Sequence, residues 1–281
     1  MVCQVVINQN SGSIPTDAVE QITAHLGDQN ITPVVDVFDG EDLQPRLRDY
    51  AHALGEDDIF IVWGGDGTIA CAFNQQFVGS APILALPGGT MNLVHKAIHK
   101  GETDWKTILN KTLASPSEIK VPAGMIADQH FFVGALFGKL TQLVQAREAL
   151  RGAELVTAVT KTLETPELFD LSPELCIKTL MDVEAHAAAA GVFIKRDQPH
   201  DLDVGIIAPT GVIDLTSIAL EALISDWRTI EGVTNLKAPR VNLSCDNDHA
   251  IHATLDGEPA ELDGPLTIEI NPNAGRALAA A

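Results

Sequence analysis

Long apolar segments are absent from this chain of 281 residues. No uncharged apolar stretch reaches the length of about 18 residues that a membrane-spanning helix requires. The segment from Met1 to Ile7 lacks the basic start of a signal peptide, and its apolar run ends at Asn8. The sequence therefore predicts neither a transmembrane helix nor a secretion signal, and we expect a cytoplasmic location.

Cysteine is also rare. Cys3, Cys71, Cys176 and Cys245 lie far apart in the sequence, and no pair has the CxxC spacing. This pattern predicts neither a disulfide framework nor a cysteine-based metal cluster. We expect reduced thiols that are mostly buried as small hydrophobic side chains.

Basic residues are outnumbered by acidic ones, 18 to 38, which leaves a net charge of −20. Such a charge repels nucleic acid and disfavours a polybasic contact with anionic lipid head groups. Any contact with a membrane is then expected to be local and largely apolar. Hydrophobic residues make up 46% of the chain, which is enough for folded cores, and the length suits two domains.

Apolar runs and helical patterns alternate in the first third of the chain. The expected strands are residues 2–7, 34–38, 59–63 and 83–86. Helices are expected from about Pro15-Thr16 and, after a turn at Asp39-Gly40, through about His52. This alternation predicts an α/β domain with a doubly wound parallel sheet, which binds ligands at the carboxyl ends of its strands.

Strand patterns dominate from about residue 118. The expected strands are 119–127, 130–136, 175–180, 191–195, 202–208, 240–245, 250–255 and 266–270. Helices are expected over 143–163 and over 215–227, the second one capped by Asp214. We predict an α/β domain over 1–117, joined by the tail 271–281, and a mostly antiparallel β-sandwich domain over 118–270. The alanine-rich end, 277–281, is expected to fray.

The segment Gly64-Gly65-Asp66-Gly67-Thr68 directly follows the third expected strand. Glycines let the backbone approach a ligand closely, and the N–H groups at the start of a following helix suit a phosphate. Asp66 is unusual there, because a carboxylate repels phosphate unless Mg²⁺ or a transferable proton lies between them. The segment matches neither the P-loop nor the dinucleotide-binding motif, and a tight strand-to-helix turn is the simpler alternative.

Two later segments have a similar character. Pro87-Gly88-Gly89-Thr90, followed by Asn92, stands after the fourth strand, so two glycine loops on neighbouring strands could face one polyphosphate. Asp256-Gly257-Glu258 follows the strand 250–255, where a hairpin turn is the default interpretation. His95 and His99 have helical spacing, and we expect them on a polar helix face rather than on a metal.

Together with Asn8, Ser11 and Gly12, these segments resemble the diacylglycerol kinase catalytic family, which includes bacterial lipid kinases, sphingosine kinases and ceramide kinases. Order and spacing match from about residue 2 to about residue 270. The resemblance implies a kinase that uses ATP and Mg²⁺ to phosphorylate a lipid hydroxyl, with an ATP cleft between two domains. It also implies a lipid substrate at a membrane surface, with a peripheral position at the inner face of the membrane. A homodimer is one open arrangement, because the sequence alone does not give the oligomeric state.

The resemblance assigns a nucleotide-binding role to residues of all three N-terminal segments. Asn8, Ser11 and Gly12 would line the nucleotide. The residues expected at the phosphates are Gly64, Gly65, Gly67 and Thr68, with Gly89, Thr90 and Asn92 beside them.

The resemblance assigns the chemistry to acidic residues. Asp256 would be the general base for the acceptor hydroxyl, and Glu258 would lie near the nucleotide and its metal. Asp66 is a competing candidate for the base or for an organiser of Mg²⁺. Asp203, with Asp201, could be a remnant of the structural Mg²⁺ site of the family, and a solvated strand start is the alternative.

The chain departs from the family at a few positions. Ala70-Cys71 stands where the family usually has Asn-Glu, Leu93 where it has Asp, and Pro122 where an acid is common. Those acids are expected on the acceptor side, so a ceramide or another lipid alcohol is an alternative to diacylglycerol. Two other hypotheses remain: an NAD-kinase-like small-molecule kinase, and a lipid- or nucleotide-binding module without turnover.

Overall fold

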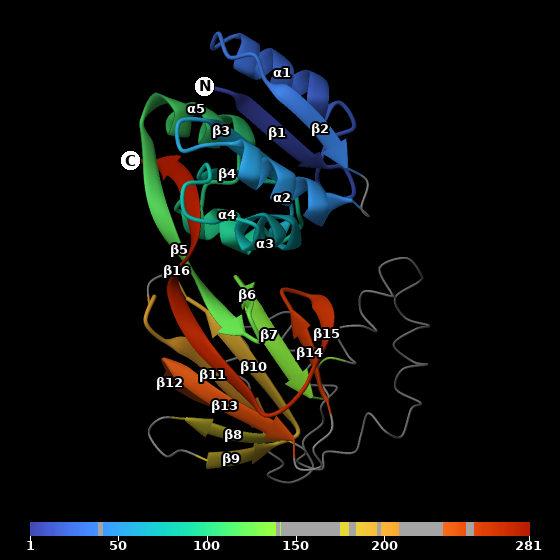
Figure 1. Cartoon of the computed structure of the whole chain (residues 1–281), viewed down its shortest axis with the longest axis vertical. Coiled ribbons are helices and arrows are strands. Elements are labelled where there is room, and N and C mark those ends of the chain that lie inside the picture. The colour runs from blue at the N-terminus through green and yellow to red at the C-terminus, as the bar shows by residue number, and fades with distance from the viewer. Residues whose placement is uncertain are drawn as a thin grey trace. The chain divides into compact units, whose positions relative to one another are not determined.

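The computed structural model describes residues 1–38, 42–138, 141, 175–179, 184–195, 198–207, 233–245 and 250–281. The chain forms two compact units (Figure 1). The first contains Met1–Ala123 and Pro272–Ala281, and the second contains Gly124–Asn271. The sequence-based boundary after residue 117 falls inside strand β5 (Pro116–Ile126), so the chain passes from one unit to the other within a strand.

The first unit is built on a parallel sheet. Its strands are β1 (Cys3–Asn8), β2 (Val34–Phe38), β3 (Ile59–Gly64), β4 (Ile83–Pro87) and the last part of β16 (Leu266–Ala280), in the order β2-β1-β3-β4-β16. All of these pairs are parallel. The register sets Gly64 opposite Pro87, so the two glycine loops leave the sheet at the same level.

Five helices accompany this sheet: α1 (Ala18–Gly27), α2 (Leu43–Ala53), α3 (Asp66–Asn74), α4 (Leu93–Ile98) and α5 (Trp105–Ala114). Helix α1 buries Ala18, Ile22 and Leu26, which recur every four residues and form one face. These side chains share a core with residues of β1, β3, β4 and α5. Full burial of a leucine or isoleucine side chain contributes about 1.5–3 kcal/mol to folding.

The C-terminal tail is ordered, and the expectation that residues 277–281 fray is wrong. Strand β16 continues to Ala280, and Ala277 pairs with Ile83 of β4. Ala277 is 0% and Ala279 is 3% exposed. Their small side chains fit in the interior of the unit, where this strand pairs with β4. Arg276 fixes the tail further by donating from its backbone N–H to Gln76 and from its guanidinium to the Ser80 carbonyl.

An acid-sensitive ion pair closes this tail onto β5. The guanidinium of Arg276 donates to both carboxylate oxygens of Glu118, at 3.0 and 2.7 Å, and lowers the pKa of Glu118 from 4.5 to about 2. Because the pKa is lower in the folded state, the pair stabilises the protein above about pH 4.5 and loses this effect as the pH falls toward 2.

We therefore expect Glu118→Gln to lower the free energy of unfolding by about 1 kcal/mol at pH 7, since the pair is partly exposed to water. The difference between the variant and the wild type should shrink below about pH 4.5 and vanish only below about pH 2. Urea denaturation at a series of pH values measures this. Glu56→Gln is the matched control, because Glu56 contacts the same guanidinium at 3.3 Å from a side chain that is 64% exposed. An equal loss of stability in both variants would contradict a specific contribution of the Glu118–Arg276 ion pair.

The second unit is an antiparallel β-sandwich. One sheet has the order β12-β11-β10-β7-β14-β15. The other contains β16, β13, β8 and β9 in that order, with β5 paired to β16 and β6 paired to β5. The strands are β6 (Gln129–Phe131), β7 (Gly134–Gly138), β8 (Leu175–Thr179), β9 (Glu184–Ala187), β10 (Ala189–Ile194), β11 (Leu202–Ile207), β12 (Val233–Ala238), β13 (Arg240–Cys245), β14 (Ile251–Leu255) and β15 (Glu258–Leu262). Residues of both sheets, such as Phe137 and Leu243, share one core. The predicted fold class, a parallel α/β domain with an antiparallel sandwich, is confirmed.

The structure corrects some of the expected elements of this unit. The single strand expected over 130–136 is two strands, β6 and β7, because the backbone turns at Phe132 and Val133 around the carboxylate of Asp256. The strands β9, β12 and β15 were not predicted. The expected helices over 143–163 and 215–227, and the expected turn at Asp39-Gly40, lie outside the described residues.

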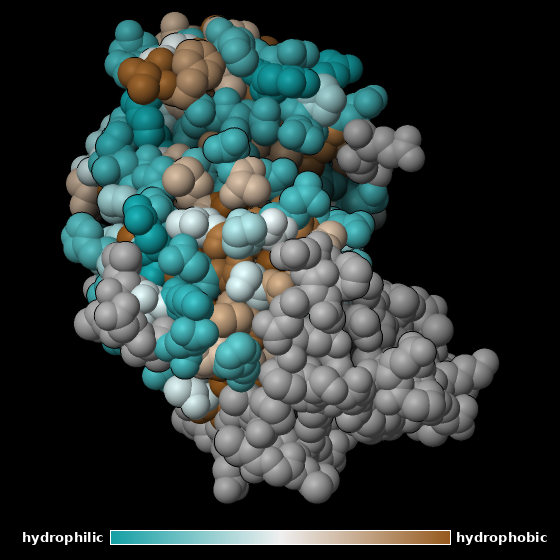
Figure 2. Space-filling model, turned by 60° about the horizontal axis from the view of Figure 1, so that its bottom comes forward, coloured by the Kyte–Doolittle hydropathy of each residue, from teal (hydrophilic) through white to brown (hydrophobic). Residues whose placement is uncertain are grey.

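In the part of the chain that the structure describes, no helix is both long and apolar enough to cross a bilayer. Figure 2 shows one face of the molecule, on which hydrophilic residues predominate over the first unit. This distribution matches the excess of acidic side chains in the sequence.

Candidate functional site

The first glycine loop joins β3 to α3 through a tight turn. Helix α3 begins at Asp66, directly after Gly65. A Cβ on Gly64 would lie 2.6 Å from the Cβ of Thr68, so only glycine fits there. The first N–H groups of α3 have no earlier turn of helix to bind, and such a helix start favours an anion.

The second glycine loop lies in backbone contact with the first. The N–H of Gly88 donates to the carbonyl of Gly64 at 2.9 Å, and a Cβ on Gly89 would lie 2.8 Å from the Cα of Gly65. Asn92 holds this loop in shape, because its side chain accepts from the N–H of Gly89 and donates to the Gly89 carbonyl. Glycine is therefore required in both loops for their mutual approach.

The loop after β1 completes the set. The side chain of Asn8 donates to the Thr68 hydroxyl at 2.8 Å, and the hydroxyl of Ser11 accepts from the N–H of Gly65 at 3.1 Å. A Cβ on Gly12 would lie 3.4 Å from the hydroxyl oxygen of Thr90. The structure thus brings together the residues that the sequence placed in three separate loops. Their roles toward a nucleotide remain predictions.

Asp66 faces the second loop. Its two carboxylate oxygens accept from the N–H groups of Leu93 and Val94, at 3.0 and 2.8 Å, at the start of α4. Burial alone would raise the pKa of Asp66, but the nearby His95 ring and these two N–H groups outweigh it and lower the pKa. The contacts indicate that Asp66 ties the two glycine loops together. A base or a Mg²⁺ ligand at Asp66 would have to share its carboxylate with these donors.

His95 is buried beside this carboxylate, and its expected place on a polar helix face is wrong. The side chain is 0% exposed, and its Nδ1 lies 3.9 Å from an oxygen of Asp66. Neither ring nitrogen has a hydrogen-bond partner among the described residues. Val94 and Ile98 of the same short helix are also buried, so the helix turns His95 inward together with its apolar side. His99 is half-buried, and its Nε2 lies 2.9 Å from the Ala85 carbonyl oxygen.

Asp256 stands in a two-residue hairpin turn between β14 and β15. Asp256 and Gly257 both have positive φ, 51° and 95°, as a tight hairpin requires. The carboxylate of Asp256 accepts three backbone N–H groups, from Phe132, Val133 and Gly134, at 2.7, 2.7 and 3.0 Å. These bonds fix the orientation of the carboxylate, and nothing in the sequence near residues 132–134 indicated them. Glu258 follows on the exposed start of β15.

Asp203 is buried in β11, and the interpretation of a solvated strand start is wrong for it. The residue is 4% exposed, and its carboxylate lies 3.1 Å from the ammonium nitrogen of Lys195. A cation already neutralises this carboxylate, so a metal at Asp203 would compete with Lys195.

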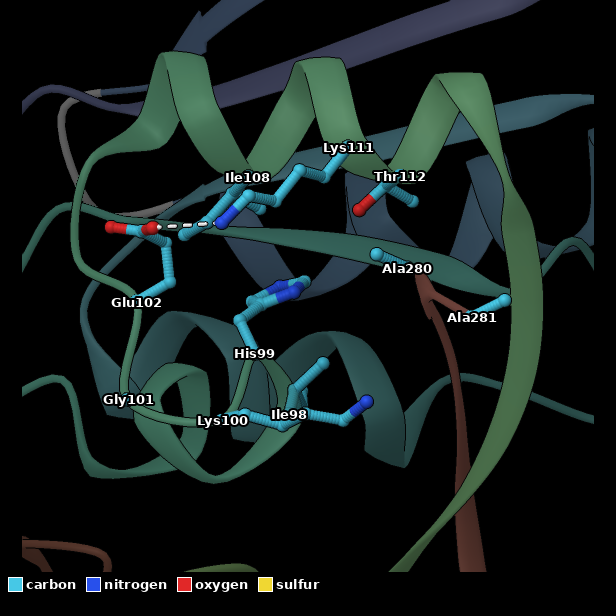
Figure 3. A pocket seen from close by; sticks show the side chains of 10 residues that line it. All are labelled: Ile98, His99, Lys100, Gly101, Glu102, Ile108, Lys111, Thr112, Ala280 and Ala281. Atoms are coloured by element: carbon cyan, nitrogen blue, oxygen red, sulfur yellow. Dashed lines mark hydrogen bonds and ion pairs between the residues drawn. The ribbon is translucent and has the colours of Figure 1, made fainter.

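A cavity of about 450 Å³ lies in the first unit (Figure 3). It is lined by the segment Ile98–Glu102, by α5 residues including Thr112, and by Ala280 and Ala281. None of the residues predicted for the nucleotide lines this cavity. This cavity is therefore distinct from the residues predicted for the nucleotide.

The comparisons with known proteins match this arrangement. Residues 3–122 match the model of the diacylglycerol kinase catalytic domain. The matched residues include all three loops described above and end just before the second unit begins.

Solved structures extend the likeness of fold beyond the catalytic domain. A diacylglycerol kinase from Bacillus anthracis str. Sterne has a TM-score of 0.66 and 14% identity over 99% of this chain and 96% of its own. A second protein of that strain, described as a diacylglycerol kinase, has a TM-score of 0.70 and 15% identity over 99% of this chain and 97% of its own. At this identity the likeness shows a shared two-unit fold.

Proposed function

We propose that this protein transfers the γ-phosphoryl group of ATP to the hydroxyl group of a lipid. The observation that carries the proposal is the convergence of three loops at the carboxyl edge of one parallel sheet, inside a diacylglycerol kinase catalytic domain. Backbone N–H groups at a helix start and small side chains around them suit a polyphosphate.

The residues present fit MgATP. Gly67 offers the clearest sign, because a Cβ on it would meet nothing within 4 Å. The fold itself does not need glycine there, whereas a phosphate that approaches the backbone does. Mg²⁺ commonly binds proteins through one or two carboxylates together with substrate phosphates, and Asp66 and Glu258 are the candidates that we retain. When bound, this cation neutralises phosphate charge.

The protein groups act by positioning and by proton transfer. Ser11 and Thr68 orient the phosphates together with the N–H groups at the start of α3. Asp256 accepts the proton of the lipid hydroxyl while the phosphoryl group leaves the β-phosphate oxygen and bonds to the hydroxyl oxygen. The three N–H groups on its carboxylate keep that side chain in one orientation.

Two exposed apolar side chains support a lipid as the acceptor. Met91 and Leu93, which flank Asn92 in the second glycine loop, are 52% and 40% exposed. Leu93 stands where the family usually has an acid. An apolar side chain that can contact a lipid therefore takes the place of a charged one. We propose a diacylglycerol-type or a ceramide-type alcohol, met at a membrane surface.

The test is an assay with radiolabelled ATP and Mg²⁺ on purified lipid classes, with NAD and soluble alcohols as parallel acceptors. We expect label in a lipid phosphate that requires both ATP and Mg²⁺. Label in NAD alone would support the small-molecule kinase instead. Tight ATP binding without transfer to any acceptor would support a binding module.

A further inference from the structure

Three side chains with metal-binding atoms meet in the second unit, on the neighbouring strands β8 and β9. Cys176 lies on β8, and Glu184 and His186 lie on β9. Their sulfur, oxygen and nitrogen atoms all lie within 4.8 Å of one another. The register sets Cys176 directly opposite His186, and Glu184 lies two residues before His186 on the same face.

The distances come close to those of one tetrahedral ion. Zinc bonds of about 2.3 Å to sulfur and about 2.0–2.1 Å to nitrogen or oxygen place neighbouring ligand atoms about 3.3–3.5 Å apart. The Sγ of Cys176 lies 3.5 Å from Oε1 of Glu184. The Nε2 of His186 lies 4.0 Å from the same oxygen. Small side-chain rotations of His186 would suffice to bring all three atoms onto one ion.

The two oxygens of Glu184 have different neighbours. Oε1 faces Cys176 and His186, whereas Oε2 lies 3.2 Å from the ammonium nitrogen of Lys178. Lys178 is paired with Glu184 across the two strands. This second contact orients the carboxylate in the way that outer hydrogen bonds orient metal ligands.

Exposure is uneven across the cluster. Cys176 is 7% exposed, whereas the side chains of His186 and Glu184 are 54% and 50% exposed. The cluster is thus anchored at its buried side and open to solvent at the other, which leaves room for water as a fourth ligand. The alternative without a metal is a hydrogen bond from the Cys176 thiol to Glu184, next to a surface histidine.

We propose that Cys176, Glu184 and His186 bind one divalent transition-metal ion of the zinc class. A thiolate and an imidazole select such ions over Mg²⁺ and Ca²⁺, which prefer oxygen ligands. The thiolate and the carboxylate together balance the two charges of the ion, and the thiol proton leaves to solvent. The ion would join β8 to β9. This site is independent of the proposed kinase activity.

The experiment uses Co²⁺ as a coloured probe, added to the metal-free full-length protein. We expect one Co²⁺ per chain, with a thiolate charge-transfer band and the intense visible bands of tetrahedral Co²⁺. Zn²⁺ should displace the probe, and excess Mg²⁺ should not. Zn²⁺, and not Mg²⁺, should also raise the Tm.

Variants locate the site. Cys176→Ser should remove the charge-transfer band, and His186→Gln, at an exposed position that the fold tolerates, should weaken Co²⁺ binding at least tenfold. Cys245→Ser is the matched control, because Cys245 pairs with Leu175 and so points to the other face of the sheet. Absence of stoichiometric binding, full binding in His186→Gln, or equal loss in Cys245→Ser would overturn the proposal.

Discussion

Replacing Asp256 by asparagine is expected to lower lipid phosphorylation by about 10²–10⁴-fold, which is the usual contribution of a positioned general base. The amide cannot accept the proton of the lipid hydroxyl. The substitution keeps the size of the side chain and tolerates the left-handed backbone at this position, where φ is 51°. Initial rates with saturating ATP and lipid measure the effect.

The same substitution also has a structural cost, and magnitudes separate the two effects. The carboxylate accepts three N–H groups, and the amide nitrogen of asparagine would turn a donor toward one of them. One unsatisfied donor costs about 1–3 kcal/mol. A domain with about 5–15 kcal/mol of stability stays folded after that loss. The loss of rate should therefore greatly exceed any loss of folded protein.

Gly257→Ala is the matched control in the same hairpin. Its Cβ would meet nothing within 4 Å, so the cost comes only from the positive φ of 95°. We expect a loss of stability of about 1 kcal/mol with the carboxylate in place. Activity per folded molecule should then stay within a few-fold of the wild type. If Gly257→Ala and Asp256→Asn lose activity in proportion to their loss of stability, Asp256 is a structural residue only.

The fold could be predicted where local patterns determine it. Strand β2 was predicted with its observed bounds, and β1, β3 and β4 were predicted to within a residue at each end, because short apolar runs end in turn residues. The meeting of the glycine loops follows from one rule, since parallel strands share a carboxyl edge. The order of the strands is therefore enough to predict that Gly64, Gly88 and Asn8 lie close together.

The features that sequence could not supply join residues distant in the chain. His95 is buried beside Asp66, which belongs to the other glycine loop. The break between β6 and β7 depends on Asp256, more than a hundred residues later. The wide spacing of the cysteines predicted no metal cluster. Spacing along the chain cannot reveal that Cys176 and His186 face each other across two strands. The alanine-rich tail was predicted to fray, because the sequence does not show that these residues form a buried strand. In the sheet, Ala277 and Ala279 are buried where only small side chains are present.

Gly67→Ala provides the sharpest test of the phosphate site, because its expected effects on stability and on binding have opposite signs. Gly67 lies in the first turn of α3, where a Cβ would meet nothing within 4 Å of protein. Alanine is favoured over glycine in a helix by up to about 1 kcal/mol, so the Tm should stay constant or rise. If phosphates lie against this backbone, the added methyl group displaces them, and ATP affinity should fall at least tenfold, about 1.4 kcal/mol.

Calorimetric titration with MgATP and a thermal melt on the same sample measure both effects. Gly27→Ala is the matched control: Gly27 ends α1, its Cβ would likewise meet nothing within 4 Å, and it lies in none of the three loops. It should raise the Tm by a similar amount and leave ATP affinity unchanged. Since the protein alone gives no reason for glycine at position 67, unchanged ATP affinity in Gly67→Ala would mean that no phosphate approaches this turn. The phosphate site would then have to lie elsewhere.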